Sequence, residues 1–222
     1  MKTEKAIGRV ERVRLNLECI GLFVAAPAMG AALGSSLAVI PLLLMVATGC
    51  ALVLHFRYQF CWRETFRLKA TGAEWRRIFA TYFIAVACLV GFLWLIKPDA
   101  LFSLARQHPQ IWLLIMVVYP LFSVIPQEII YRAYFFERYQ GLFGTGNKMV
   151  LVSSVLFSFG HILFHNWVAM LLTLIAGWLF GNTYRRTRSL SLVAIEHALY
   201  GCAAFTIGYG QFFFDHTMQA YR

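Results

Sequence analysis

Apolar residues fill seven long stretches of the chain, and shorter segments rich in basic or polar residues separate these stretches. A helix needs about 20 apolar residues to cross the hydrocarbon core of a bilayer, and each stretch approaches that length. The pattern therefore predicts seven transmembrane helices. Their expected ranges are 15–33, 37–56, 78–96, 111–139, 149–165, 167–184 and 190–209.

The overall composition is typical of a membrane protein, because 60% of the 222 residues are hydrophobic and only 14% are charged. We expect an all-α, polytopic membrane helical bundle that forms a single integral membrane domain over residues 1–222. No internal repeat is evident, which argues against a carrier built from inverted halves. The five cysteines are scattered without CxxC spacing, so we predict neither disulfides nor a thiolate metal site.

The basic residues indicate how the chain is oriented in the membrane. A net charge of +10 could suit a nucleic-acid partner. The basic residues flank the apolar stretches, however, so we expect no nucleic acid. With the amino terminus inside, only Lys97, Arg106 and Arg222 of the 20 Lys and Arg residues lie outside. Under the positive-inside rule this bias predicts a multi-pass protein of the cell membrane whose amino terminus is cytoplasmic.

The connecting segments differ in character between the two sides. Gly34–Ser36 and residues 97–110 are expected outside. Residues 57–77, expected in the cytoplasm, interleave basic and aromatic side chains. Such a mixture is typical of a segment that lies on anionic lipid. A solvated cytoplasmic loop explains the same composition, and both interpretations stay open.

Glu128 and Arg132 lie inside an apolar stretch, where charged side chains are rare. A charge at the centre of a bilayer costs roughly 2.5–3.5 kcal/mol on insertion scales, and such residues usually face a protein interior. Because they are four residues apart, they share one face of a helix and can pair. Pro126 removes a backbone hydrogen bond nearby, so we expect a kink there. The pair is either a structural ion pair or part of a functional site.

Two histidines in later stretches are expected at a similar depth. Counting about 1.5 Å per helical residue from the expected cytoplasmic ends places Glu128, His161 and His197 close to one level. Ionisable groups from three helices at one depth suggest a shared polar cavity, with Arg132 nearby.

Two chemistries suit this set. In the first, Glu128 acts as a general base on water, His161 positions the water and His197 stabilises the oxyanion, while Arg132 orients Glu128. In the second, His161 and His165 bind a divalent metal with Glu128 or His197. We expect no metal or other cofactor, because the residues between His161 and His165 lack the glutamate of the zinc-protease motif.

Three short motifs contain these residues, and they follow one another in the order Gln127-Glu128-x-x-x-Arg132, Phe157-x-x-x-His161 and His197-x-x-x-Gly201. Over about residues 111–209 their order and spacing resemble the CAAX protease and bacteriocin-processing family. These are glutamic-type intramembrane proteases related to the CAAX prenyl endopeptidase. The family pattern is Glu-Glu-x-x-x-Arg, Phe-x-x-x-His and His-x-x-x-Asn/Asp.

The chain departs from the family pattern at two positions. The resemblance implies that a glutamate at position 127 activates water and that a side chain at position 201 helps to hold the oxyanion. Gln127 cannot accept a proton at neutral pH, and Gly201 has no side chain. Glu128 lies about 100° away around the helix and replaces the base only if the chain turns it inward. The candidate catalytic residues are Gln127, Glu128, Arg132, His161 and His197.

The leading hypothesis is an intramembrane endopeptidase that uses glutamate/histidine-activated water. It would hydrolyse a peptide bond of a membrane-associated or lipidated peptide, and a prenylated substrate follows only from the resemblance. The alternative is a non-catalytic relative that binds a membrane peptide or protein as a docking or immunity factor. A third hypothesis is a carrier of ions or small molecules. The expected partners are a membrane-embedded peptide or protein and the lipid bilayer.

Overall fold

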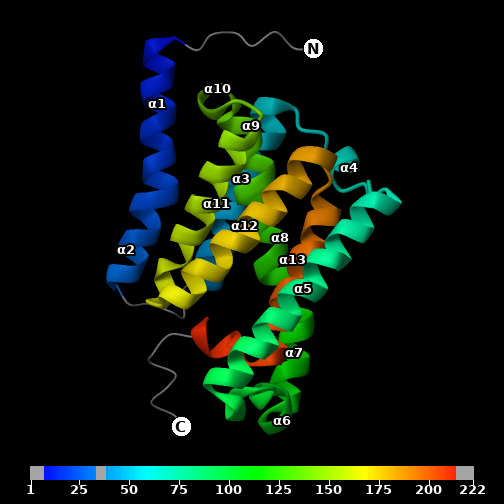
Figure 1. Ribbon diagram of the computed structural model, residues 1–222. Helices are drawn as coiled ribbons and strands as arrows, with labels where there is room; N and C mark the ends of the chain where they lie inside the picture. Colours follow the sequence, from blue (N-terminus) through cyan, green and yellow to red (C-terminus); the bar gives the residue numbers. More distant parts are fainter. Residues whose placement is uncertain (1–7, 34–38, 214–222) are drawn as a thin grey trace.

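Seven helical spans make up the protein in its computed structural model, which describes residues 8–33 and 39–213 (Figure 1). Each span is long and apolar enough to cross a membrane, and the residues so described form no strand. The prediction of an all-α bundle with seven transmembrane helices is confirmed. The spans are Arg9–Leu33, Val39–Tyr58, Gly72–Ile96, Pro109–Arg138, Asn147–Phe164, Trp167–Thr187 and Leu190–Ile207.

Some spans contain several helical elements and others contain one. The composite spans are built from α1 (Arg9–Ile20) and α2 (Ala26–Leu33), from α7 (Pro109–Tyr119), α8 (Ile125–Glu128) and α9 (Phe135–Arg138), and from α11 (Asn147–Gly160) with a 3₁₀ turn. The single-helix spans are α3 (Val39–Tyr58), α5 (Gly72–Ile96), α12 (Trp167–Thr187) and α13 (Leu190–Ile207). The short helices between spans are α4 (Trp62–Thr65), α6 (Ser103–Gln107) and α10 (Gln140–Phe143).

Two spans begin earlier than the apolar pattern indicated. The first begins at Arg9 and the third at Gly72. The additional turns at their starts carry charged residues, so the apolar pattern did not include them. A helix can carry such residues where it emerges from the hydrocarbon core of the bilayer. The Thr71 hydroxyl caps α5 by accepting a hydrogen bond from the backbone N–H of Glu74 at 3.2 Å. The start of α5 is therefore set by a polar cap rather than by apolar periodicity.

The connections between spans gather at the two ends of the bundle (Figure 1). The start of α1, α4, α10 and the turn between α12 and α13 lie at one end, and α6 lies at the other. Hydrogen bonds fasten residues 66–67 to the start of α13, where the Ser189 hydroxyl donates to the Arg67 carbonyl at 2.8 Å. The described segments that we expect in the cytoplasm thus share one end. Residues 1–7, the turn at Gly34–Ser36 and residues 214–222 lie outside the described residues.

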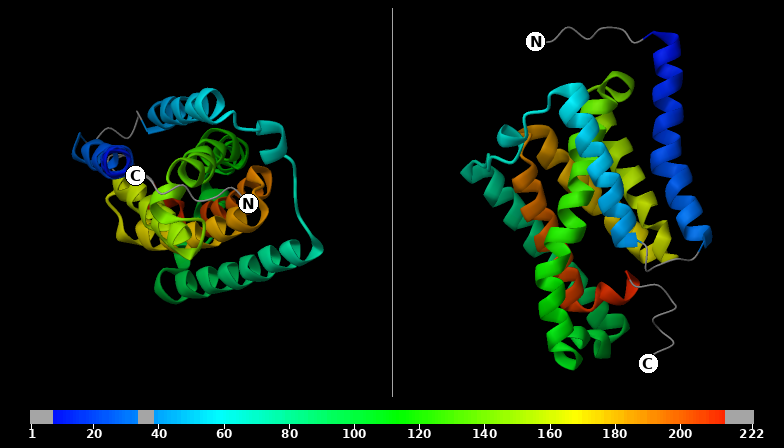
Figure 2. Two further views of the ribbon diagram at one scale, coloured as in Figure 1. Left: turned by 90° about the horizontal axis from the view of Figure 1, so that it is seen from above. Right: turned by 180° about the vertical axis from the view of Figure 1, so that it is seen from behind.

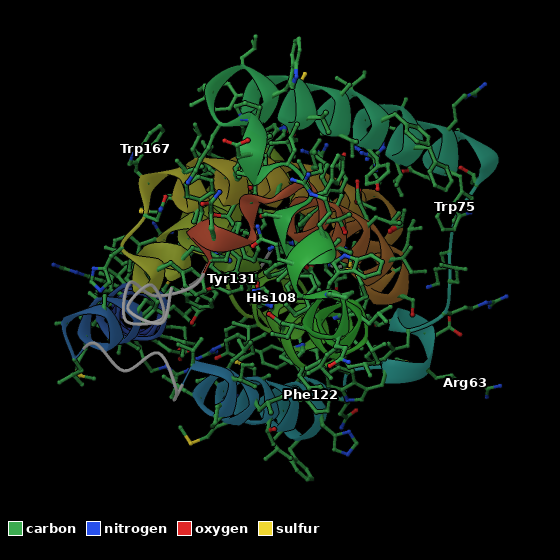
Figure 3. All side chains as sticks on the ribbon, turned by 90° about the horizontal axis from the view of Figure 1, so that it is seen from below. Arg63, Trp75, His108, Phe122, Tyr131 and Trp167 are labelled. Atoms are coloured by element: carbon green, nitrogen blue, oxygen red, sulfur yellow. The ribbon has the colours of Figure 1, made fainter. Side chains whose placement is uncertain are left out.

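The fourth span, Pro109–Arg138, runs through the middle of the bundle. Helices α3, α11 and α13 pack against it, and Figure 2 shows it enclosed between them. Helix α5 lies at the periphery and packs against α13. Large apolar side chains at the rim point outward, among them Phe122 and Trp167 (Figure 3). The outer surface is therefore suited to lipid. It includes much of the first half of the fourth span, whereas the second half, from Val124 onward, is mostly buried.

The central span departs from regular α-helix on both sides of α8. One π-helical stretch covers Pro120–Val124 and another covers Ile129–Tyr134. Pro120 and Pro126 lack the N–H that an α-helix would bond to its preceding turn, so the local hydrogen bonds must rearrange. We expected a disturbance at Pro126, and the irregular turns lie before and after that residue. Such π-helical turns are frequent at functional sites.

Candidate active site

Glu128, the last residue of α8, is the centre of the candidate site. Its side chain is 0% exposed. One carboxylate oxygen, Oε1, lies 2.7 Å from Nδ1 of His197 on α13. The other oxygen, Oε2, faces Nε of Arg132 at 3.3 Å. The structure therefore brings three of the sequence-predicted residues into direct contact. One carboxylate joins the motif of the fourth span to that of the seventh.

Arg132 lies in the second π-helical stretch and is 0% exposed. Its guanidinium lies 4.9 Å from the centre of the Phe157 ring and 5.8 Å from that of Phe180. Its Nη1 reaches the Ser153 hydroxyl at 3.5 Å. An arginine can lie in an apolar interior when a carboxylate and aromatic faces offset its charge. Arg132 thus neutralises Glu128 without exposing either side chain.

His197 is held in one orientation by its neighbours. Its ring stacks on Phe180 with centroids 4.6 Å apart and meets the edge of Phe157 at 5.6 Å. An ionised carboxylate accepts hydrogen bonds but donates none, so the contact with Glu128 requires the proton on Nδ1. In the neutral ring, Nε2 is then a free acceptor. This arrangement prepares His197 to take a proton from a bound molecule.

His161 contacts the Phe157 ring, as His197 does. It begins the 3₁₀ turn after α11, and its ring centroid is 4.8 Å from that of Phe157. Its Nδ1 is 2.8 Å from the Phe157 carbonyl oxygen, which can only accept, so this nitrogen carries the proton and Nε2 is an acceptor. Phe157 therefore contacts both His161 and His197, and among the described residues no hydrogen bond joins His161 to Glu128.

Gln127 makes different contacts from its neighbour Glu128. Its amide nitrogen donates to the Ser123 hydroxyl at 2.7 Å. Its Oε1 is buried and has no hydrogen-bond partner among the residues that the structure describes. The amide is only partly buried, whereas Glu128 is enclosed. The side chain at position 127 thus offers a free acceptor, but it is no part of the contacts between Glu128, Arg132 and His197.

Comparison with known families agrees with this geometry. Residues 109–203 match the family described as type II CAAX prenyl endopeptidase Rce1-like. Over this segment the chain is similar to the CAAX protease family. Searches of curated proteins and of solved structures gave no match. The matched segment covers the fourth to seventh spans apart from the last residues of α13, and it contains all three motifs. The resemblance inferred from the motifs is confirmed.

The CAAX protease assignment and the seven apolar helices together define the class of protein. It is a multi-pass membrane protein, and the family that residues 109–203 resemble is one of intramembrane proteases. The assignment rests on the region in which the Glu128 contacts lie.

His165, the other candidate metal ligand, lies apart from the CAAX protease motifs. It follows the 3₁₀ turn in a left-handed conformation with φ 49°. Its Nε2 contacts the Ala31 carbonyl oxygen in α2 at 3.1 Å, so it joins the fifth span to the first. Over residues 8–33 and 39–213, no group of three or more His, Cys, Asp or Glu side chains is placed to hold a metal ion.

Several residues at the site were missed by sequence reasoning. Phe180 and Ser153 contact His197 and Arg132, but nothing in their local pattern separates them from ordinary core residues. Tyr119, at the end of α7, places its ring centroid 6.1 Å from that of His197. It precedes Pro120 and the first π-helical stretch. The proline-rich sequence around it was the one signal that could have drawn attention to this tyrosine.

A cavity of about 490 Å³ lies on another side of α13. It is open and mostly apolar, and it separates parts of α5 and α13, with Tyr82, Val86 and Cys202 among its lining residues. None of the five candidate catalytic residues lines it. This cavity therefore differs from the shared polar cavity that the sequence led us to expect.

Proposed function

We propose that this protein is an intramembrane endopeptidase that hydrolyses a peptide bond of a membrane-embedded or lipidated peptide. The observation that carries the proposal is the buried contact of 2.7 Å between Glu128 Oε1 and His197 Nδ1. A carboxylate that holds an imidazole fixes its tautomer and stabilises the imidazolium that forms when the ring takes a proton. The CAAX protease family match supports the same class of reaction.

His197 is the proposed general base. Its Nε2 takes a proton from water as the water oxygen bonds to the carbonyl carbon of the substrate, and the carbonyl oxygen becomes an oxyanion. The imidazolium then returns the proton to the amide nitrogen as the carbon–nitrogen bond breaks. The products are a carboxylic acid and an amine. Because Glu128 is enclosed, it acts through His197 as a positioning residue rather than as the base itself.

His161 and Gln127 are the proposed contacts of the attacking water. The Nε2 of His161 and the Oε1 of Gln127 are both acceptors, so each can take a hydrogen bond from a water molecule. Gln127 cannot remove the proton, which leaves that step to a histidine. Arg132 keeps Glu128 oriented through the contact of 3.3 Å and neutralises its charge. No metal or other cofactor takes part in this proposal.

The proposed orientation places the amino terminus and residues 57–77 in the cytoplasm, in a single domain of the cell membrane. Arg63 and Trp75 reach outward at one edge of the bundle (Figure 3), which supports contact of this segment with anionic lipid. Labelling of a Lys69→Cys variant in intact cells tests the orientation. Reaction with a reagent that cannot cross the membrane would contradict it.

The function is tested with the purified protein in lipid vesicles and a library of membrane peptides. We expect cleavage by the wild type and a loss of about 10²–10⁴-fold in kcat for His197→Ala, the usual contribution of a general base. His165→Ala is the matched control, because His165 lies outside the site, and it should retain activity. If neither the wild type nor Gln127→Glu cleaves any peptide, the proposal fails and a docking protein becomes the better account.

A further inference from the structure

Tyr119 occupies the place where the third family motif departs from its pattern. Gly201 lies one turn after His197 on α13, at the position where the family has Asn or Asp. A Cβ atom built on Gly201 would collide with the hydroxyl and the ring of Tyr119. The tyrosine comes from α7, far from Gly201 in the sequence. Its hydroxyl therefore fills the space in which a side chain at position 201 would begin.

The packing around Tyr119 fixes the position of the hydroxyl. The ring meets the edge of the His197 ring, with centroids 6.1 Å apart, and the edge of the Phe205 ring at 5.2 Å. His197, Gly201 and Phe205 are spaced by four residues and share one face of α13. Edge-to-face contacts of this kind favour a defined ring orientation. The glycine between the two rings is what allows the tyrosine to approach the helix.

The hydroxyl is a hydrogen-bond donor with no partner among the described residues. The hydroxyls of the neighbouring Tyr200 and Tyr209 donate to Thr81 and to the Leu89 carbonyl, whereas the Tyr119 hydroxyl remains available. A neutral phenol can donate at membrane depth without the cost of placing a charge there. It is thus suited to receive negative charge that appears during a reaction.

We propose that Tyr119 donates a hydrogen bond to the oxyanion and so replaces the side chain that the family motif has at position 201. The inference rests on the proposed function. When His197 takes the proton from water and the water oxygen attacks, the carbonyl oxygen gains a negative charge. The Tyr119 O–H stabilises that charge while keeping its proton. Donor and base then lie on one face of α13, as attack on a single carbonyl requires.

The first test removes only the hydroxyl. Tyr119→Phe keeps the ring over Gly201, so the protein should fold and unfold as the wild type does. Losing one oxyanion donor lowers kcat by about 10²–10³-fold, and KM should change by less than about threefold. Tyr200→Phe is the matched control, because it keeps the ring and its hydroxyl already donates to Thr81 on α5 at 3.0 Å. That variant should retain the wild-type kcat.

The second test moves the donor back to α13. Tyr119→Ala opens the space beside Gly201 and should lower kcat at least as much as Tyr119→Phe. Adding Gly201→Asn to Tyr119→Ala restores an amide donor, and we expect a gain of at least about tenfold in kcat over Tyr119→Ala alone. A tyrosine that only filled space would give no such gain, because asparagine does not refill the volume of the ring.

The outcomes separate this inference from the proposed function. If the wild type cleaves peptides and Tyr119→Phe cleaves them at the same rate, the inference is overturned while the protease function stands. Failure of the rescue with a folded double variant would also overturn it. If neither the wild type nor Gln127→Glu cleaves any peptide, the proposed function fails and the inference fails with it.

Discussion

Glu18 and Glu128 each face an arginine inside the bundle, but their surroundings differ. Glu18, in α1, accepts hydrogen bonds on Oε1 from the Tyr134 hydroxyl at 2.8 Å and the Tyr139 hydroxyl at 3.0 Å. Arg138 donates hydrogen bonds to both carboxylate oxygens, from Nε to Oε1 at 2.8 Å and from Nη2 to Oε2 at 2.5 Å. Burial raises the pKa of the Tyr139 hydroxyl, which therefore stays protonated and donates. The Glu18 cluster thus joins α1 to the end of the central span.

Glu128 has fewer partners although it is more deeply buried. Its single hydrogen bond goes to His197. Among the described residues, its Oε2 and the Nε and Nη2 atoms of Arg132 have no hydrogen-bond partner, so Oε2 and Nε meet only as an ion pair. Buried polar groups left in this state need an explanation beyond stability. The structural carboxylate of Glu18 thus accepts several hydrogen bonds, whereas the Glu128 carboxylate accepts one, from the His197 imidazole.

The largest difference in the free energy of unfolding is expected between variants of the two arginines, Arg132 and Arg138. Arg132→Met leaves the buried Glu128 charge without its cationic partner, which should lower the free energy of unfolding by about 3–5 kcal/mol and abolish cleavage. Unfolding in mixed detergent and peptide cleavage measure the two effects. If Arg132→Met unfolds like the wild type, Arg132 does not neutralise a buried charge.

Arg138→Met is the matched variant at the Glu18 cluster. It removes a two-pronged contact that is partly open to solvent, so the free energy of unfolding should fall by about 1–3 kcal/mol. The kcat of peptide cleavage should stay within about threefold of the wild type, because the Glu18 cluster lies away from the site. A loss of activity without a loss of stability would mean that the comparison assigns the wrong cluster to structure.

Two tyrosine hydroxyls sharpen the comparison further. Tyr134→Phe removes one donor to Glu18 and should cost about 0.5–1.5 kcal/mol of stability. Tyr119→Phe should cost almost none, because its hydroxyl has no partner among the described residues, yet it should lower kcat. The free energy of unfolding and the kcat of cleavage are measured for both variants. Tyr134→Phe should lose stability and Tyr119→Phe should lose activity. Equal stability losses in the two variants would contradict it.

The smallest effect is expected for Ser153→Ala. The Ser153 hydroxyl donates to the Tyr131 carbonyl at 2.8 Å and lies 3.5 Å from Arg132 Nη1, at the limit of a hydrogen bond. We expect a loss below about 1 kcal/mol in stability and a decrease of only a few fold in kcat. A loss as large as that of Arg132→Met would show that Ser153, rather than Glu128, holds the guanidinium.

The helical bundle could be predicted from the sequence because the lipid bilayer places the same strong requirement on every transmembrane helix. Each span must be apolar and about 20 residues long, so seven apolar stretches gave seven helices. Helix ends were less accurate. They depend on polar caps and on turns such as that at His165, which apolar periodicity does not report. The capping pattern of Thr71 and Glu74 does mark the start of α5 in the sequence. The π-helical turns around α8 also escaped prediction, since two prolines indicate a disturbance but not its form.

The candidate site was predicted in part. The spacing of Glu128 and Arg132 on one helix indicated their contact, and the motif order indicated that His197 lies near them. The sequence could not show that Arg132 and His197 lie among aromatic rings, because those rings, Phe157 and Phe180, come from other helices. It also could not show that Tyr119 meets Gly201. That contact joins residues from two separate spans, and only the missing side chain at position 201 hinted at it.

The most direct test of the account compares two variants at neighbouring positions. Peptide cleavage in isotopically labelled water is measured for the wild type, Glu128→Gln and Gln127→Glu. If Glu128 acts through His197, the wild type should cleave and place one labelled oxygen in the new carboxyl group. Glu128→Gln should then lower kcat by about 10²–10⁴-fold while the protein stays folded. An inert wild type together with an active Gln127→Glu variant would contradict the account, because the essential carboxylate would then belong at position 127.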